Sequence, residues 1–138
     1  RYRGKTQCLK CNGSRVRKDA LYVQIAKKNI AEINRMSILE AIDFFNNIKL
    51  DATSKNIANR IILEIKNRLR FIKEVGLGYL TLDRKSNSLS GGESQRINLA
   101  TSIGSPLVGA MYILDEPSIG LHSKDTERLI RILMSYRV

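Results

Sequence analysis

The chain has 138 residues, 43% of them apolar, which is enough for a small core but leaves little margin of stability. Its 24 Lys and Arg residues against 13 Asp and Glu give a formal net charge of +11, which favours an anionic partner such as a nucleic acid or a nucleotide phosphate over a membrane surface. No apolar run of about 18 residues and no apolar leader stretch occurs, so the sequence argues against a membrane span and a secretory signal. We expect a cytoplasmic protein.

The N-terminal segment, residues 1–19, is the most basic part of the chain. Seven Lys and Arg residues and one acid lie within residues 1–20, which is more than half of the net charge. Such a segment favours phosphate contacts that do not depend on base sequence, and we assign Arg15, Arg17 and Lys18 to DNA binding. We interpret the segment as the end of an upstream module.

A cysteine pair within this segment has the turn pattern of many zinc modules. Cys8 and Cys11 form C-x-x-C-N-G. Tetrahedral zinc needs four ligands, and the sequence has no further cysteine and no nearby histidine. Three interpretations stay open: the pair binds a metal in this chain alone, it is half of a metal site in a longer protein, or it is two reduced thiols or a turn remnant.

The next region combines a strand pattern with a helix pattern. Apolar and polar side chains alternate over residues 20–25, which predicts a half-buried strand, and the polar residues 27–29 predict a turn. Ser37 with Glu40 three residues later forms a capping box, which predicts a short amphipathic helix. The apolar residues of that helix recur at helical spacing: Ile38, Ala41, Ile42 and Phe45.

The longest periodic segment covers residues 54–75, and Gly76 ends it. Apolar side chains recur at i, i+3, i+4 and i+7 intervals and predict one buried helix face. They are Ala58, Ile61, Ile62, Ile65, Leu69 and Ile72. The basic residues of the segment are spread around the other faces, which fits either a solvated surface or nucleic-acid contact.

A glycine turn opens the following predicted helix. Ser90 and Glu93 form a second S-x-x-E box, so a helix should begin near Gly91 and continue to Gly104. Gly91 and Gly92 leave first-turn N–H groups accessible at the positive end of the helix dipole, and the Ser90 hydroxyl can donate a further hydrogen bond to a phosphate. The alternative is structural, because two glycines can simply end a loop.

Two acids follow an uninterrupted apolar run. Residues 110–114 predict a buried strand that places Asp115 and Glu116 at its carboxyl end, where open α/β sheets bind ligands. One acid can hold Mg²⁺ and its neighbour can orient a water for attack on a γ-phosphate. The alternative is that both acids cap the loop.

Two motifs together resemble those of ABC-type ATPases. "LSGGESQR" is similar to their signature motif, and "YILDEPSIGLH" is similar to their Walker B strand, catalytic glutamate and D-loop. More narrowly, "CLKCNGSRVRKDALYVQIAKKNIAEI", "SILEAIDFF" and "VGLGYLTLDRKSNSLSGGESQRINLATSIG" resemble the UvrA family, the damage-recognition ATPases of bacterial nucleotide excision repair. That resemblance covers nearly the whole chain. "SIGLH" is more similar to the D-loop of the first of the family's two nucleotide-binding domains.

The resemblance implies composite ATP sites, in which one domain's signature contacts the γ-phosphate of an ATP held mainly by the other domain. The cofactor-binding residues are then Ser90, Gly91, Gly92 and Gln95. Asp115 assists Mg²⁺ binding, and Glu116 polarises the attacking water. The parent protein would bind ATP, Mg²⁺ and DNA, with Zn²⁺ as a further candidate. Its other implied partners are the rest of the parent chain, a second copy of the parent and a UvrB-like repair subunit, with no membrane.

Two elements of the family pattern are missing from this sequence. No G-x-x-x-x-G-K-[S/T] phosphate loop occurs, and the later switch histidine is absent. His122 is the only histidine and fits a structural role in the D-loop better than that of a catalytic base. We therefore expect no ATP hydrolysis by this chain alone. Because it neither begins with Met nor ends its last helix on a cap, we expect a fragment of a longer protein.

These inferences define an α/β fragment of an ABC-type ATPase domain in three parts. A basic C-x-x-C segment covers residues 1–19, a helical signature subdomain covers 20–109, and the Walker B strand, D-loop and following helix cover 110–138. Two alternatives stay open: another ABC-type ATPase, or a basic DNA-binding module that keeps the motifs without nucleotide chemistry.

Overall fold

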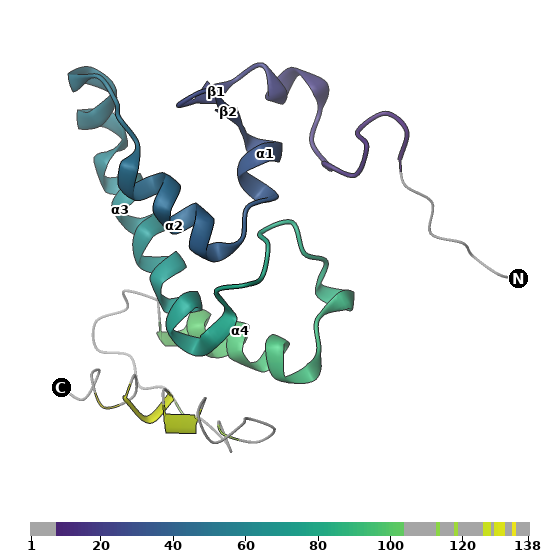
Figure 1. Cartoon of the computed structure of the whole chain (residues 1–138), viewed down its shortest axis with the longest axis vertical. Helices are drawn as coiled ribbons and strands as arrows, with labels where there is room; N and C mark the ends of the chain where they lie inside the picture. Colours follow the sequence, from purple (N-terminus) through teal and green to yellow (C-terminus); the bar gives the residue numbers. More distant parts are fainter. Residues whose placement is uncertain are drawn as a thin grey trace, which may run out of the picture.

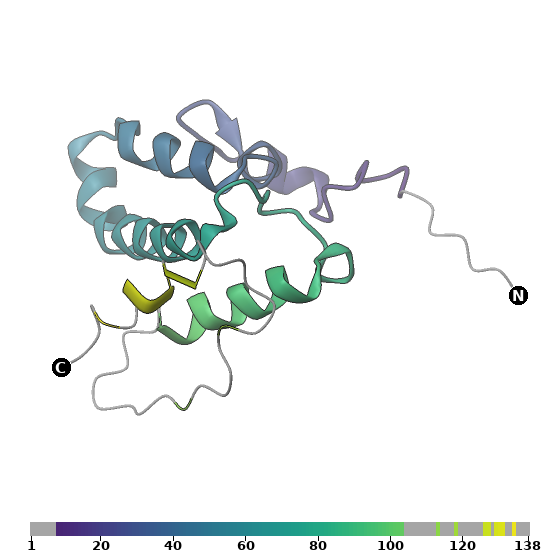
Figure 2. The same cartoon turned by 60° about the horizontal axis from the view of Figure 1, so that its bottom comes forward.

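The computed structural model describes residues 8–103 and several positions after them: residues 113, 118, 126, 127, 129–131 and 134. Three helices form its main body, α2 (Ile38–Asn47), α3 (Ala52–Ile72) and α4 (Gly91–Ile103). The long helix α3 lies between the other two and packs against both (Figure 1, Figure 2). The described part is mostly helical with a small antiparallel sheet, which is consistent with the expected α/β fragment.

A short hairpin occupies the region where a half-buried strand was expected over residues 20–25. Its elements are the 3-10 helix η1 (Lys18–Leu21) and the antiparallel strands β1 (Gln24–Ile25) and β2 (Lys28–Asn29). The turn lies at Ala26 and Lys27, whose φ angles are 47° and 65°, so the turn predicted over 27–29 begins one residue earlier. The strand prediction was wrong because η1 extends to Leu21 and, within the part of the chain that the structure describes, both strands of this two-residue ladder are mostly exposed.

Capping boxes begin the two helices that follow the hairpin. Asn29 caps α1 (Ile30–Asn34), and its side chain accepts from the backbone N–H of Glu32. At α2 the Ser37 N–H donates to Glu40 Oε2 over 2.8 Å, and the Glu40 N–H donates to Ser37 Oγ over 3.2 Å. The predicted box at Ser37 is therefore confirmed. The face of α2 expected to be apolar is also confirmed, with Ile38, Ala41 and Phe45 buried and Ile42 half-buried.

Helix α3 begins two residues before its predicted start, because the Asp51 side chain accepts from the Ser54 N–H and caps it. Its inner face is built as expected around buried Leu69. Ile61 is an exception, since 62% of this residue is exposed. A rotation of about 100° per residue places Ile61 beside the line of inward-facing side chains rather than on it.

A π-helical turn, η2 (Lys73–Leu77), ends α3 as Gly76 predicted. Gly76 has a φ of 83°, a left-handed conformation that is costly for residues with a Cβ. The chain then runs back along the start of α2. There the Ile38 N–H donates to the Leu80 carbonyl over 2.8 Å, and the Leu39 N–H donates to the Gly78 carbonyl over 3.1 Å.

Two apolar clusters stabilise this arrangement. One joins α1, α2 and α3, and its buried residues are Ile33, Ile38, Ala41, Phe45 and Leu69. The other joins the loop after α3 to α4, and its buried residues are Val75, Leu77, Leu80, Leu99, Ala100 and Leu129. Ile72 packs against both clusters from the end of α3.

Among the described residues, none of the helices combines the length and apolar content needed to cross a bilayer. The buried strand expected over 110–114 lies outside the described residues except for Ile113, which is 84% exposed.

The capping box of α2 generates a first prediction. Ser37→Ala removes the oxygen that accepts from the Glu40 N–H, so we expect the free energy of unfolding to fall by about 1 kcal/mol. Urea unfolding of the chain measures this change. Ser86→Ala, at an exposed serine in the 3-10 helix η3 (Ser86–Ser88), is the matched control and should leave the free energy nearly unchanged. Equal stability of the two variants would contradict the role of the box.

Candidate functional site

The predicted glycine turn forms the start of α4. The Ser90 N–H donates to Glu93 Oε2 over 2.7 Å, and the Glu93 N–H donates to Ser90 Oγ over 3.2 Å. This reciprocal pair is the capping box that the sequence predicted. It fixes the helix start at Gly91, also as predicted.

The outer side of this turn is open. A Cβ added to Gly91 would meet nothing within 4 Å, and Ser90 is exposed. The N–H groups of Gly91 and Gly92 belong to the first helical turn, where an α-helix supplies no carbonyl acceptor. An anion could therefore approach backbone donors here without meeting a side chain. Packing does not explain why residue 91 lacks a side chain.

The inner side of the turn is held by a residue that the sequence did not indicate. The Tyr79 hydroxyl donates to Glu93 Oε1 over 2.7 Å, and Glu93 is only 8% exposed. The Ser90 N–H first, and the Tyr79 hydroxyl second, hold the pKa of the Glu93 carboxyl below its usual range. The same hydrogen bond raises the pKa of Tyr79. No periodicity or short motif signals this contact between a loop and a helix.

Two other polar side chains of α4 lie close to the turn. Gln95, predicted to bind the nucleotide, is half-buried in the second turn of the helix. Arg96 Nε donates to the Gly92 carbonyl over 3.3 Å. The structure thus brings Ser90, Gly91, Gly92 and Gln95 together on one helix end.

The cysteine pair lies in a tight turn that backbone hydrogen bonds hold. The Asn12 N–H donates to the Cys8 carbonyl and the Ser14 N–H to the Cys11 carbonyl, each over 2.9 Å. Backbone N–H groups, first that of Arg15 and then that of Gly13, lower the pKa of the Cys11 thiol. Such a turn suits a thiolate ligand. Among the described residues no third His, Cys, Asp or Glu joins the pair, so they supply two metal ligands at most.

The three basic residues assigned to DNA have different surroundings. The Arg15 guanidinium donates to the Asp83 carbonyl, which ties the cysteine turn to the loop before α4. Arg17 pairs with Asp19 over 3.3 Å, and both side chains are largely exposed. Lys18 is exposed at the start of η1. Arg17 and Lys18 thus remain accessible to a ligand, whereas Arg15 already has a structural contact.

The two predicted catalytic acids, Asp115 and Glu116, lie outside the described residues, as does His122. Their placement on a strand end therefore stays a prediction.

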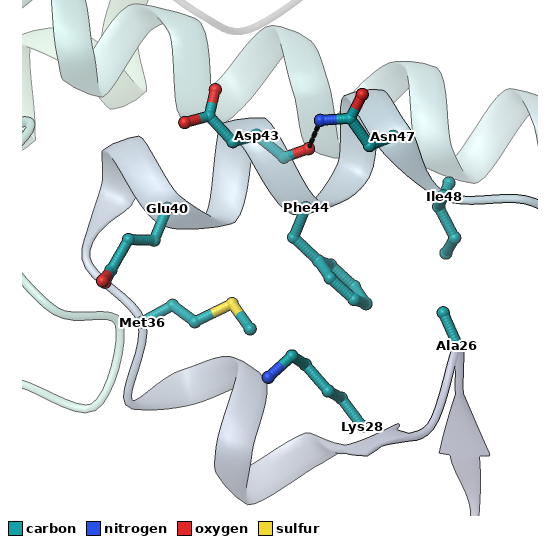
Figure 3. Close-up of a pocket in the computed structure, with 8 residues that line it drawn as sticks. All are labelled: Ala26, Lys28, Met36, Glu40, Asp43, Phe44, Asn47 and Ile48. Carbon is teal, nitrogen blue, oxygen red and sulfur yellow. Dashed lines mark hydrogen bonds between the residues drawn. The ribbon is translucent and has the colours of Figure 1, made fainter.

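A separate cavity lies between the hairpin and α2 (Figure 3). Its volume is about 600 Å³. Phe44 of α2 projects toward the hairpin, where Ala26 and Lys28 form the opposite wall. Glu40 also lines it, and its pKa is lowered first by the Ser37 N–H and less by the charge of Lys28. None of the residues that the sequence predicted for a site lines this cavity.

The capped glycine turn opens a helix of a mostly helical subdomain. This arrangement agrees with the class that the sequence motif "LSGGESQR" resembles, the ABC-type ATPases.

Comparison with known proteins identifies the family within this class. The chain is 50% identical over 136 residues to UvrABC system protein A of Streptomyces avermitilis. It is 52% identical to the proteins of the same name from Lactococcus lactis and Methanothermobacter thermautotrophicus, over 136 and 137 residues. Each match covers 99% of this chain and 14% of the relative, so the chain spans about a seventh of the length of these relatives.

A solved structure agrees with this result. The crystal structure of UvrA2 from Deinococcus radiodurans matches with a TM-score of 0.76 and 36% identity, covering 92% of this chain and 17% of that one. No protein-family model matches the chain. Over nearly its whole length the chain therefore matches one segment of the longer UvrA proteins.

The depressed pKa of Glu93 generates a second prediction. A carboxyl whose pKa is lower in the folded chain contributes stability above its unfolded pKa and loses it as pH falls through the folded value. Glu93→Gln should therefore flatten the decline of unfolding free energy below about pH 5. Glu74→Gln, at an exposed carboxylate after α3, is the control and should keep the original slope. Identical slopes for both variants would contradict the assigned contacts.

Proposed function

We propose that this segment supplies the signature turn of a UvrA-type DNA-damage-recognition ATPase. The observation that carries the proposal is the open, capped turn at Ser90–Glu93. There the first-turn N–H groups and the Ser90 hydroxyl lie around Gly91, which has no side chain and has open space beside it. Its relatives are named UvrABC system protein A, which supports a role in excision of damaged DNA. In the longer protein this turn would contact the γ-phosphate of ATP held by an opposite nucleotide-binding domain.

Catalysis in this proposal depends on parts beyond the turn. Asp115 would hold Mg²⁺, and Glu116 would orient the attacking water. The sequence has no phosphate loop of the G-x-x-x-x-G-K-[S/T] type, so another part of the parent protein must bind the β- and γ-phosphates. The segment is therefore one half of a composite site and is inactive alone. The assignment to the first of two nucleotide-binding domains belongs to the same proposal.

The proposed partners follow from charge and from the family. Exposed Arg17 and Lys18 support contact with DNA phosphates near the cysteine turn. A second copy of the parent chain, a UvrB-like subunit and a cytoplasmic location complete the proposal.

The cysteine turn supports a zinc half-site. The lowered pKa of the Cys11 thiol fits a thiolate ligand, and Cys8 is exposed in the same turn. Cys8 and Cys11 would hold two corners of a tetrahedral site, with the other two ligands supplied by the parent chain. Zinc would supply structural stability there rather than chemistry.

The open turn generates a third prediction. Gly92→Asp places bulk and negative charge where a phosphate must dock, so ATP turnover by the full-length protein should fall at least about a hundredfold. Steady-state hydrolysis measures the loss, and thermal melting checks folding. Ser86→Asp is the control, because it adds the same charge at an exposed serine of η3 and turnover should change little. Hydrolysis by Gly92→Asp at the unmodified rate would contradict phosphate recognition by the turn.

The basic segment generates a fourth prediction. Replacing both Arg17 and Lys18 by Ala should weaken binding of this chain to duplex DNA and reduce the slope of log affinity against log salt by about 2. Fluorescence anisotropy at several salt concentrations gives both quantities. Lys49→Ala, at an exposed lysine between α2 and α3, should leave the slope unchanged. Binding that is insensitive to salt would contradict the electrostatic account.

A further inference from the structure

The loop after α3 connects the starts of two helices. On one side its carbonyls at Gly78 and Leu80 accept from the first amides of α2, over 3.1 and 2.8 Å. On the other side the Tyr79 hydroxyl reaches the Glu93 carboxylate at the start of α4, over 2.7 Å. The same three residues therefore contact the N-termini of α2 and α4.

The backbone around Tyr79 is fixed independently of its ring. Leu77 and Leu80 are buried on either side of it, at 0% and 4% exposure. Gly78 lies so close to Leu39 that an added Cβ would meet the Leu39 Cγ at 3.0 Å. Tyr79 itself is 58% exposed. Its ring thus contributes little to the core, and its specific contact is the hydrogen bond of its hydroxyl.

Each oxygen of the Glu93 carboxylate has its own donor. Oε2 accepts from the Ser90 N–H, and Oε1 accepts from the Tyr79 hydroxyl. A glutamate held only by its capping contact could rotate about its side-chain torsions. The Tyr79 hydroxyl removes that freedom, and through Glu93 it fixes the Ser90 backbone.

We propose that Tyr79 is a positioning residue for the signature turn: its hydroxyl holds the Glu93 carboxylate, which holds the Ser90 N–H, so that the Ser90 hydroxyl and the Gly91 N–H stay available to a phosphate. This inference rests on the proposed phosphate contact of the turn. It adds that the loop after α3 sets the geometry of that contact, although Tyr79 lies on the inner side of the turn and touches no ligand.

The test is Tyr79→Phe in the full-length protein that carries this segment. We expect kcat for ATP hydrolysis to fall about fivefold, because a hydrogen bond to a charged group is lost where the turn must be ordered. ADP affinity should stay close to that of the unmodified protein, since ADP lacks the γ-phosphate. The melting temperature should fall only slightly, since one hydrogen bond to Glu93 is lost while the ring remains in place. Tyr22→Phe is the matched control, at a tyrosine that is 83% exposed, and should leave kcat unchanged.

A double-mutant cycle then tests whether Tyr79 acts through Glu93. In a Glu93→Ala background the hydroxyl has lost its acceptor, so Tyr79→Phe should cause no further fall in kcat. An equal fall in both backgrounds would overturn the proposal. If Glu93→Ala does not fold, the single Tyr79→Phe variant decides, and an unchanged kcat or a parallel loss of ADP affinity overturns it.

Gly92→Asp separates this inference from the function on which it rests. If Gly92→Asp abolishes turnover while Tyr79→Phe leaves kcat unchanged, the turn contacts the phosphate but Tyr79 does not position it. If Gly92→Asp hydrolyses ATP normally, the phosphate contact itself is wrong, and the positioning role falls with it.

Discussion

The described structure depends on how the unpaired amides at helix N-termini are satisfied. The first turn of an α-helix has N–H groups with no carbonyl acceptor within the helix. Each of α1 to α4 begins with a side-chain oxygen that accepts from one of them: Asn29, Ser37, Asp51 and Ser90. In three of these helices a glutamate three residues later completes a reciprocal box. These bonds are local, so they set each helix start independently of how the helices pack.

The box at α4 differs from the other two in its surroundings. Glu32 and Glu40 are exposed, whereas Glu93 is buried and has the additional contact with Tyr79. The turn proposed to meet a phosphate is thus the one whose cap is also joined to a distant loop. The capping box sets where the turn begins in the sequence. The hydrogen bond from Tyr79 to Glu93 sets where the turn lies relative to the loop after α3.

Local patterns were sufficient to predict much of the helical structure and the glycine turn. The boxes at Ser37 and Ser90 could be identified because their hydrogen bonds join residues three apart, a spacing that is visible in the sequence. The contact of Tyr79 with Glu93 joins residues 14 apart through a loop, and no periodicity encodes which loop meets which helix. The strand expected over 20–25 was wrong for a related reason. Alternation predicts a buried sheet face only where a second layer exists to cover it.

Ile72 has a consequence for how the described part unfolds. It packs against both apolar clusters at the point where α3 ends, so the two clusters share a side chain as well as a helix. Loosening either cluster removes packing from the other, and this couples them into one cooperative unit. Some amide protons on α2 and α4 exchange with solvent only when both clusters open together. These amides would share one free energy of opening, although the two helices bury different residues.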